Sequence, residues 1–180
     1  MSARDRYAPG PEDHAHIEKD GARWVLVLRR DLLHPPELVW DAITDPAQLR
    51  EWAPFDADRN LGSAGAPVRL TTVGAPMLHV TETTIERAEP PTLLVYDWGG
   101  EQMRWELEAT AEGTRLTLWT SIDRQYIAMG AAGWHLCLDV LAHSLAGEPM
   151  GRIVGMEALS FEPWQTLHQR YRERFGVEMS

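Results

Sequence analysis

The sequence has a single cysteine and no long hydrophobic run, and these two features exclude several classes of protein. Cys137 has no second cysteine to pair with, which excludes an internal disulfide and fits a reducing compartment. No run of 18 or more apolar residues occurs, so no membrane-spanning helix is expected. Residues 1–20 are polar and lack the apolar core of a signal peptide. We therefore expect a cytoplasmic protein without membrane insertion.

Lysine and functional motifs are also scarce. Lys19 is the only lysine, and the net charge of −10 predicts no nucleic-acid partner, because polyanions would be repelled. His-Glu-x-x-His, Cys-x-x-Cys, Gly-x-Ser-x-Gly, Walker and dinucleotide motifs are all absent. The Gly-rich residues 62–65 lack the lysine of a phosphate-binding loop, and His14 and His16 are too few for a metal site. We expect no cofactor and no metal.

The composition is that of an ordinary globular protein, except that tryptophan is frequent. At 180 residues, 44% of them hydrophobic, it can bury the core of one domain. Eight tryptophans indicate an interior that takes large side chains, or a cavity lined by aromatic faces, with core packing as the alternative for each one. They are Trp24, Trp40, Trp52, Trp98, Trp105, Trp119, Trp134 and Trp164.

Hydrophobic periodicity predicts strands around two short helices in residues 24–122. Residues 24–32 alternate and are rich in Val and Leu, as is typical of a strand. Pro36 suits a first helical turn and Asp45 suits an N-cap, so two short helices are expected before Pro54. Short connections between the later segments favour an antiparallel meander. Its strands are expected at 68–73, 77–88, 93–98, 102–109 and 115–122.

Two helices are expected near the C-terminus. In residues 130–147 one apolar stripe contains Trp134 and Leu138, while Val140 lies on nearly the opposite side, so both faces need cover. A second helix from Pro163 to Gly176 can provide that cover. His135, Asp139 and His143 recur at i, i+4 and i+8 of the long helix, where we expect a solvated polar stripe in preference to a metal site.

Residues 32–52, LLHPPELVWDAITDPAQLREW, resemble the first motif of the START-like (SRPBCC) superfamily, in its activator of Hsp90 ATPase homologue 1-like branch. Residues 85–98, 113–118 and 133–134 resemble the later signatures of that branch, and the resemblance covers about residues 23–147. It implies an α+β helix-grip (START/Bet v 1-like) fold, a curved antiparallel sheet wrapped around a long C-terminal helix. We expect a flexible arm at 1–20, the helix-grip domain at 21–147, and a C-terminal extension at 148–180 whose helix packs on the domain.

The resemblance also implies a cavity between sheet and long helix, and therefore the binding of a hydrophobic or aromatic small molecule. Relatives bind lipids, hormones or polyketides, and many have a histidine where this chain has Thr120. Ligand sites are typically apolar with a few placed polar groups. The residues expected to bind the ligand are His79, Thr81, Tyr96, Trp98, Met103, Trp105, Leu118, Thr120, Trp134, Leu138 and Leu141.

Two other functions stay open from the sequence. The first is an enzyme of the cyclase, dehydratase or hydrolase kind, in which His79 or another inward polar group acts as the base. The second is an interaction module, a stress-response or co-chaperone-like partner or a homodimer, that uses the face around Trp119. No catalytic residue is assigned, and a non-catalytic binding protein is favoured.

Overall fold

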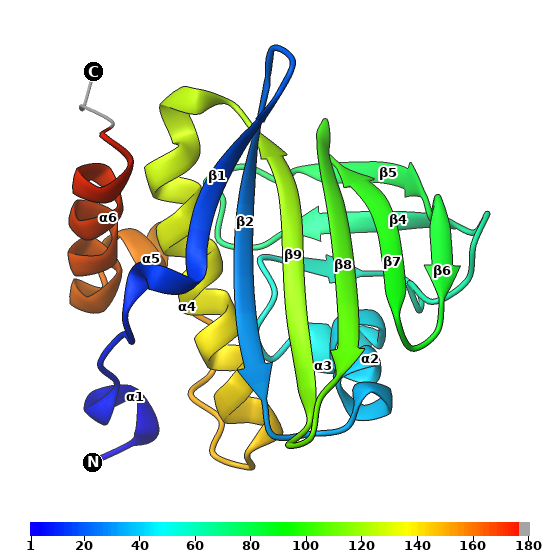
Figure 1. The fold of residues 1–180 in the computed structure, drawn as a ribbon, viewed down its shortest axis with the longest axis horizontal. Coiled ribbons are helices and arrows are strands. Elements are labelled where there is room, and N and C mark those ends of the chain that lie inside the picture. The colour runs from blue at the N-terminus through cyan, green and yellow to red at the C-terminus, as the bar shows by residue number, and fades with distance from the viewer. Residues whose placement is uncertain (177–180) are drawn as a thin grey trace.

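The computed structural model describes residues 1–176, and its largest element is a six-stranded antiparallel sheet (Figure 1). Its strand order is β1-β2-β9-β8-β7-β6. The strands are β1 (Ala15–Asp20), β2 (Arg23–Leu32), β9 (Thr114–Ile122), β8 (Glu101–Ala109), β7 (Leu93–Trp98) and β6 (Arg87–Glu89). A three-stranded sheet consists of β3 (Phe55–Ala57), β4 (Pro67–Thr72) and β5 (Val80–Thr84).

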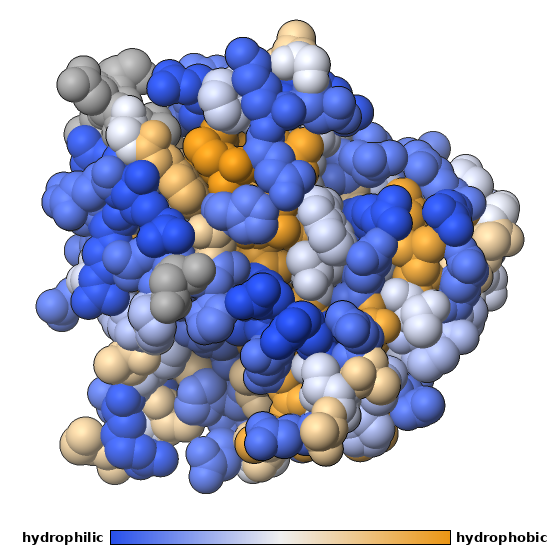
Figure 2. Space-filling model, viewed as in Figure 1, coloured by the Kyte–Doolittle hydropathy of each residue, from blue (hydrophilic) through white to orange (hydrophobic). Residues whose placement is uncertain are grey.

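The alternation of the strands separates an apolar inner face from a polar outer face. The register places Leu28 beside Leu118, Leu118 beside Trp105, and Trp105 beside Leu94, so one inner row runs across four strands. The outer face is turned toward the viewer in Figures 1 and 2, where hydrophilic residues cover most of it. Trp119 lies on this outer face but is half-buried, with the guanidinium of Arg104 5.9 Å from its ring, so it is less exposed than the sequence suggested.

Helices cover the inner face, behind the sheet in Figure 1. Helix α2 (Pro36–Thr44) begins at a proline, and α3 (Pro46–Leu49) is capped by Asp45, whose side chain accepts a hydrogen bond from the backbone N–H of Ala47. The indole of Trp52 donates a hydrogen bond of 2.9 Å to the carbonyl of Ala42, which fixes the turn after these helices onto α2. This part of the fold follows the sequence prediction closely.

The long helix α4 (Ile127–Leu145) lies along the inner face and is itself covered by α6 (Glu162–Phe175), with the short α5 (Gly155–Leu159) between them (Figure 1). Leu138 and Val140, which lie on opposite sides of α4, are both buried, and Trp164, Leu167 and Tyr171 are the buried residues of α6. The two apolar faces of α4 are therefore both covered. The predicted helix-grip architecture is confirmed. Among the described residues, no helix is long and apolar enough to cross a bilayer.

Residues 1–20, where a flexible arm was expected, contain regular secondary structure. Helix α1 (Ala3–Arg6) and the 3-10 turn Glu12–His14 precede β1, which pairs along its whole length with β2. Ala15 is buried and Ile17 half-buried on the inner face, while His16 and Glu18 are exposed. This short alternation was missed because the apolar positions are only Ala and Ile within polar sequence. The boundaries of the other proposed segments stay predictions.

The single strand expected at 77–88 is also wrong. The backbone of Ile85 pairs with Ala66 and Gly65, whereas the N–H of Glu86 donates to the carbonyl of Val95. The chain thus leaves the small sheet and joins the large one between residues 85 and 86. Residues 75–79 lie before β5 and are exposed, because the strand begins only at Val80.

The solvated polar stripe expected on α4 is wrong as well. His135 is only 1% exposed; its Nδ1 lies 2.6 Å from the hydroxyl of Tyr171 and its Nε2 3.3 Å from Asp139. Asp139 also accepts a hydrogen bond from Tyr7 and pairs with Arg30. Burial tends to raise the pKa of Asp139, but the His135 hydrogen bond and charge, Arg30 and Tyr7 together lower it below its usual value. Buried polar groups need partners, and this network joins α4 to α6, β2 and the N-terminus.

Candidate ligand-binding cavity

The centre of the space between sheet and α4 is filled by side chains. Most of the residues expected to bind a ligand lie there, each no more than 1% exposed: Tyr96, Met103, Trp105, Leu118, Thr120, Leu138 and Leu141. The indole of Trp105 donates to the hydroxyl of Tyr96 over 3.2 Å, and the hydroxyl of Thr120 donates to the sulfur of Met103 over 3.2 Å. Their polar groups are therefore satisfied within the core, and none of them lines the cavity described next.

A chain of aromatic rings leads from this filled centre to one end of the sheet. The ring centroids of Trp105 and Trp134 are 5.8 Å apart, those of Trp134 and Trp98 are 6.1 Å apart, and those of Trp98 and Phe55 are 5.0 Å apart. Trp98 and Trp134, both expected ligand-binding residues, also line a cavity next to these rings. The aromatic rings thus fill the sheet centre and form one wall of an open space at its end.

This cavity has a volume of about 570 Å³ and lies where β7 ends, β8 begins and β9 ends, against the first half of α4. The volume is within the range of small-molecule sites. Its lining is almost entirely apolar. The lining residues are Pro54, Gly74, Ala75, Pro76, Trp98, Glu101, Ile122, Met129, Gly130, Gly133, Trp134, Cys137, Ile153, Val154, Gly155, Met156, Ala158, Leu159 and Trp164.

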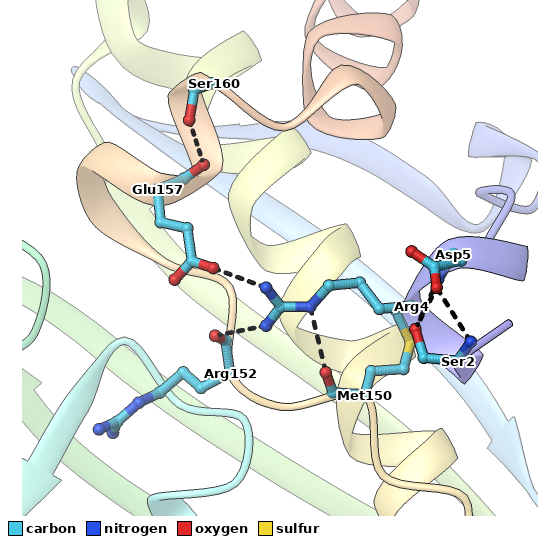
Figure 3. Close-up of polar contacts among 7 residues, drawn as sticks. All are labelled: Ser2, Arg4, Asp5, Met150, Arg152, Glu157 and Ser160. Carbon is cyan, nitrogen blue, oxygen red and sulfur yellow. Dashed lines mark hydrogen bonds and ion pairs between the residues drawn. The ribbon is translucent and has the colours of Figure 1, made fainter.

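Residues 153–159 supply the wall opposite the sheet, and charged side chains hold this segment in place (Figure 3). The guanidinium of Arg4 donates to the carbonyls of Met150 and Arg152 over 3.2 and 3.3 Å, and pairs with Glu157 at 2.6 Å. Arg152 in turn pairs with Asp56 at 2.6 Å. The N-terminal helix and β3 therefore both hold the cavity wall.

A contact between two glycines brings this wall against the loop after β4. Gly155 and Gly74 both have positive φ, and the N–H of Met156 donates to the carbonyl of Gly74 over 3.0 Å. A Cβ on Gly155 would lie 2.5 Å from that carbonyl oxygen. Only glycine allows the two backbones to approach this closely.

Among the described residues, Glu101 is the only charged one that lines the cavity, and the sequence analysis missed it. The register pairs Glu101 with Trp98, and places it on the inner face with Met103 and Trp105. Burial and, second, the nearby charge of Asp97 raise the pKa of the Glu101 carboxyl. Extending the alternation of 102–109 back by one residue would have found it.

The remaining expected residues lie outside the cavity lining. His79 is exposed in the loop before β5, so its proposed inward face is wrong; the strand parity does not apply to a residue outside the strand. Thr81 is half-buried on β5. Cys137 does line the cavity, but burial raises the pKa of its thiol to about 12, so it is not a thiolate near neutral pH. Among the described residues no group of three or more metal-ligating side chains occurs.

The comparisons with known proteins agree with this architecture. CalU16 from Micromonospora echinospora is 22% identical over 90% of this chain and 93% of its own, with a TM-score of 0.64. EF2215 from Enterococcus faecalis is 14% identical over 90% of both chains, with a TM-score of 0.66. DynU16 is 24% identical over 72% of this chain and 50% of its own, with a TM-score of 0.62. No curated protein matches the sequence.

A family model provides the assignment. Residues 33–146 match the model described as Activator of Hsp90 ATPase homolog 1-like protein. This match covers more than half of the chain, and it includes the two short helices, most of the strands and α4. The resemblance identified from residues 32–52 and the later signatures is confirmed, and the chain belongs to the Activator of Hsp90 ATPase homolog 1-like family.

Proposed function

We propose that this protein binds a hydrophobic, aromatic small molecule in the cavity between the end of the sheet, the first half of α4 and residues 153–159. The observation that carries the proposal is an open volume of about 570 Å³ whose lining is apolar except for Glu101. Three indole rings, those of Trp98, Trp134 and Trp164, line it and offer flat faces to an aromatic guest.

The driving force would be burial of apolar surface. A tricyclic aromatic guest that buries about 250 Å² of its surface gains about 6 kcal/mol at about 25 cal/mol per Å². The loss of translational and rotational freedom opposes this gain, so affinity depends on how completely the guest fills the space.

Binding without chemistry is favoured over an enzyme. Of the described residues that line the cavity, the only titratable side chains are Glu101 and Cys137, and the Cys137 thiol has a pKa of about 12. His79, the base considered from the sequence, is exposed outside the lining. A general base needs to lie within hydrogen-bond reach of the group that it deprotonates. DynU16, a structural relative, is described as a protein of the dynemicin biosynthetic locus, which is consistent with a small-molecule role.

Filling the cavity from α4 tests the proposal. A Cβ on Gly133 would meet only the indole nitrogen of Trp164, at 4.0 Å, so a side chain at this position has room to enter the cavity. We expect Gly133→Phe to abolish binding of anthracen-9-ylmethanol, measured by quenching of tryptophan fluorescence. The fold should persist, because replacing a helical glycine removes a cost of about 0.5–1 kcal/mol.

Gly133→Ala is the matched control, because it also replaces the helical glycine but adds only a methyl group. It should bind the anthracene alcohol as the wild type does. If the wild type shows no saturable quenching, or if Gly133→Phe binds as well as Gly133→Ala, the proposal is wrong.

A further inference from the structure

We propose that Glu101 determines the ligand specificity of this cavity, and that it selects an aromatic molecule carrying a protonated amine. The inference rests on the proposed binding function and names the class of guest. It excludes fatty acids and other anionic amphiphiles as preferred ligands.

The position of Glu101 is unusual for an acidic side chain. Glu101 is the only charged residue on the inner face of β7, β8 and β9; its partner in the register is Trp98 on β7, and Ile122 at the end of β9 lines the same cavity. Its side chain is half-buried and lines the apolar cavity. Acidic side chains are rarely buried unless a cation compensates their charge.

No such cation is present beside Glu101. Within residues 1–176, its carboxylate has neither a hydrogen-bond donor nor an ion-pair partner, and no Lys or Arg lines the cavity. Several acidic residues elsewhere in the sheets have an arginine partner: Glu106 pairs with Arg104, Glu82 with Arg69, and Asp31 with Arg115. The missing positive charge at Glu101 is therefore one that a bound molecule can supply.

The surrounding charge and aromatic rings favour the same class of guest. Burial and the charge of Asp97 both raise the pKa of Glu101, so its ionised form is disfavoured and a neighbouring ammonium group would stabilise it. Trp98 lies opposite Glu101 in the register, and an indole face attracts a cation by a further cation–π interaction. An anionic guest would face the Glu101 carboxylate, and no described side chain of the lining would compensate its charge.

Three ligands that share one aromatic body test this inference. Anthracen-9-ylmethylamine, anthracen-9-ylmethanol and anthracene-9-carboxylate are cationic, neutral and anionic, and each is titrated against the full chain by tryptophan fluorescence at neutral pH. We expect the amine to bind about tenfold more tightly than the alcohol, because a charge-assisted hydrogen bond is gained. The carboxylate should bind most weakly.

The variant Glu101→Gln removes the charge and keeps the shape. It should bind the amine about tenfold more weakly than the wild type does, and its affinity for the alcohol should be unchanged, which also shows that it is folded. Glu112→Gln is the matched control, because it makes the same charge change in the exposed turn between β8 and β9. It should leave all three affinities as they are in the wild type.

The outcomes separate this inference from the binding function itself. If the alcohol binds but the amine binds no more tightly, or if the preference for the amine survives in Glu101→Gln, the role of Glu101 is refuted while the binding function stands. If none of the three ligands binds the wild type, the binding function is refuted and this inference with it.

Discussion

The contact between Gly155 and Gly74 should make Gly155→Ala unusually damaging for a single methyl group. The added Cβ would lie 2.5 Å from the carbonyl oxygen and 2.7 Å from the Cα of Gly74, so the wall segment 153–159 must move away from the loop. That movement breaks the 3.0 Å hydrogen bond from the N–H of Met156 to Gly74. The positive φ of Gly155, +60°, adds strain of its own for alanine.

The magnitude follows from these separate costs. An alanine at positive φ costs about 1 kcal/mol, and a lost backbone hydrogen bond costs about 1 kcal/mol. Displacement of the packed wall adds about 1 kcal/mol more. We therefore expect Gly155→Ala to lower the free energy of unfolding by about 3 kcal/mol, measured by urea denaturation with linear extrapolation.

Gly147→Ala is the control, because Gly147 has a φ of +77° and a Cβ there meets no atom within 4 Å. Its free energy of unfolding should fall only by the cost of alanine at positive φ, about 1 kcal/mol. Gly155→Ala should also bind anthracen-9-ylmethanol more weakly than Gly147→Ala does, because the cavity wall is displaced. Equal losses of stability and affinity in the two variants would refute the role of the glycine contact.

Three further changes test other parts of the structure. Arg4→Met removes the bonds to Met150, Arg152 and Glu157, and stopped-flow fluorescence should show faster release of anthracen-9-ylmethanol; an unchanged rate would contradict the role of Arg4 in holding the wall. Tyr171→Phe leaves the Nδ1 of buried His135 without its partner, so the free energy of unfolding measured in urea should fall by about 1–2 kcal/mol. An unchanged free energy of unfolding would refute the coupling of α6 to α4. The pKa of Asp139 is lower in the folded state, so its contribution to stability is fully present above pH about 4 and is lost as the pH falls through the folded value. Asp139→Asn should therefore have a lower free energy of unfolding than the wild type at pH 7, and this difference should shrink near pH 2 in urea denaturation. A difference that stays constant with pH would contradict this.

Most of the fold could be predicted from the sequence because local patterns determine it. The alternation of Met103, Trp105 and Leu107 indicates which face of β8 is buried, and the prolines and Asp45 mark where α2 and α3 begin. The point within residues 77–88 at which the chain passes from the small sheet to the large one could not be found in this way. A strand pattern gives the two faces of a segment, but it does not show that the chain changes sheets at residue 85.

The candidate site was only partly predictable, for a physical reason. Periodicity identified Trp98, Trp134 and the core residues around them as inward-facing, but inward residues both fill a core and line a cavity. The difference depends on how bulky rings such as Trp105 fill the centre, and on where residues 153–159 lie. That segment is placed by Arg4 and Asp56, which are far from it in sequence, so no local pattern could locate the wall.

The measurement that most directly tests the position of the binding site is NMR of the protein with ¹³C-labelled methionine methyl groups in the presence of anthracen-9-ylmethanol. Met129 and Met156 line the cavity, whereas Met103 is buried in the filled centre of the sheet. We predict intermolecular NOEs from the anthracene protons to the methyl groups of Met129 and Met156, and none to Met103. NOEs to Met103, or saturable binding with no NOE to Met129 or Met156, would contradict a site at the end of the sheet.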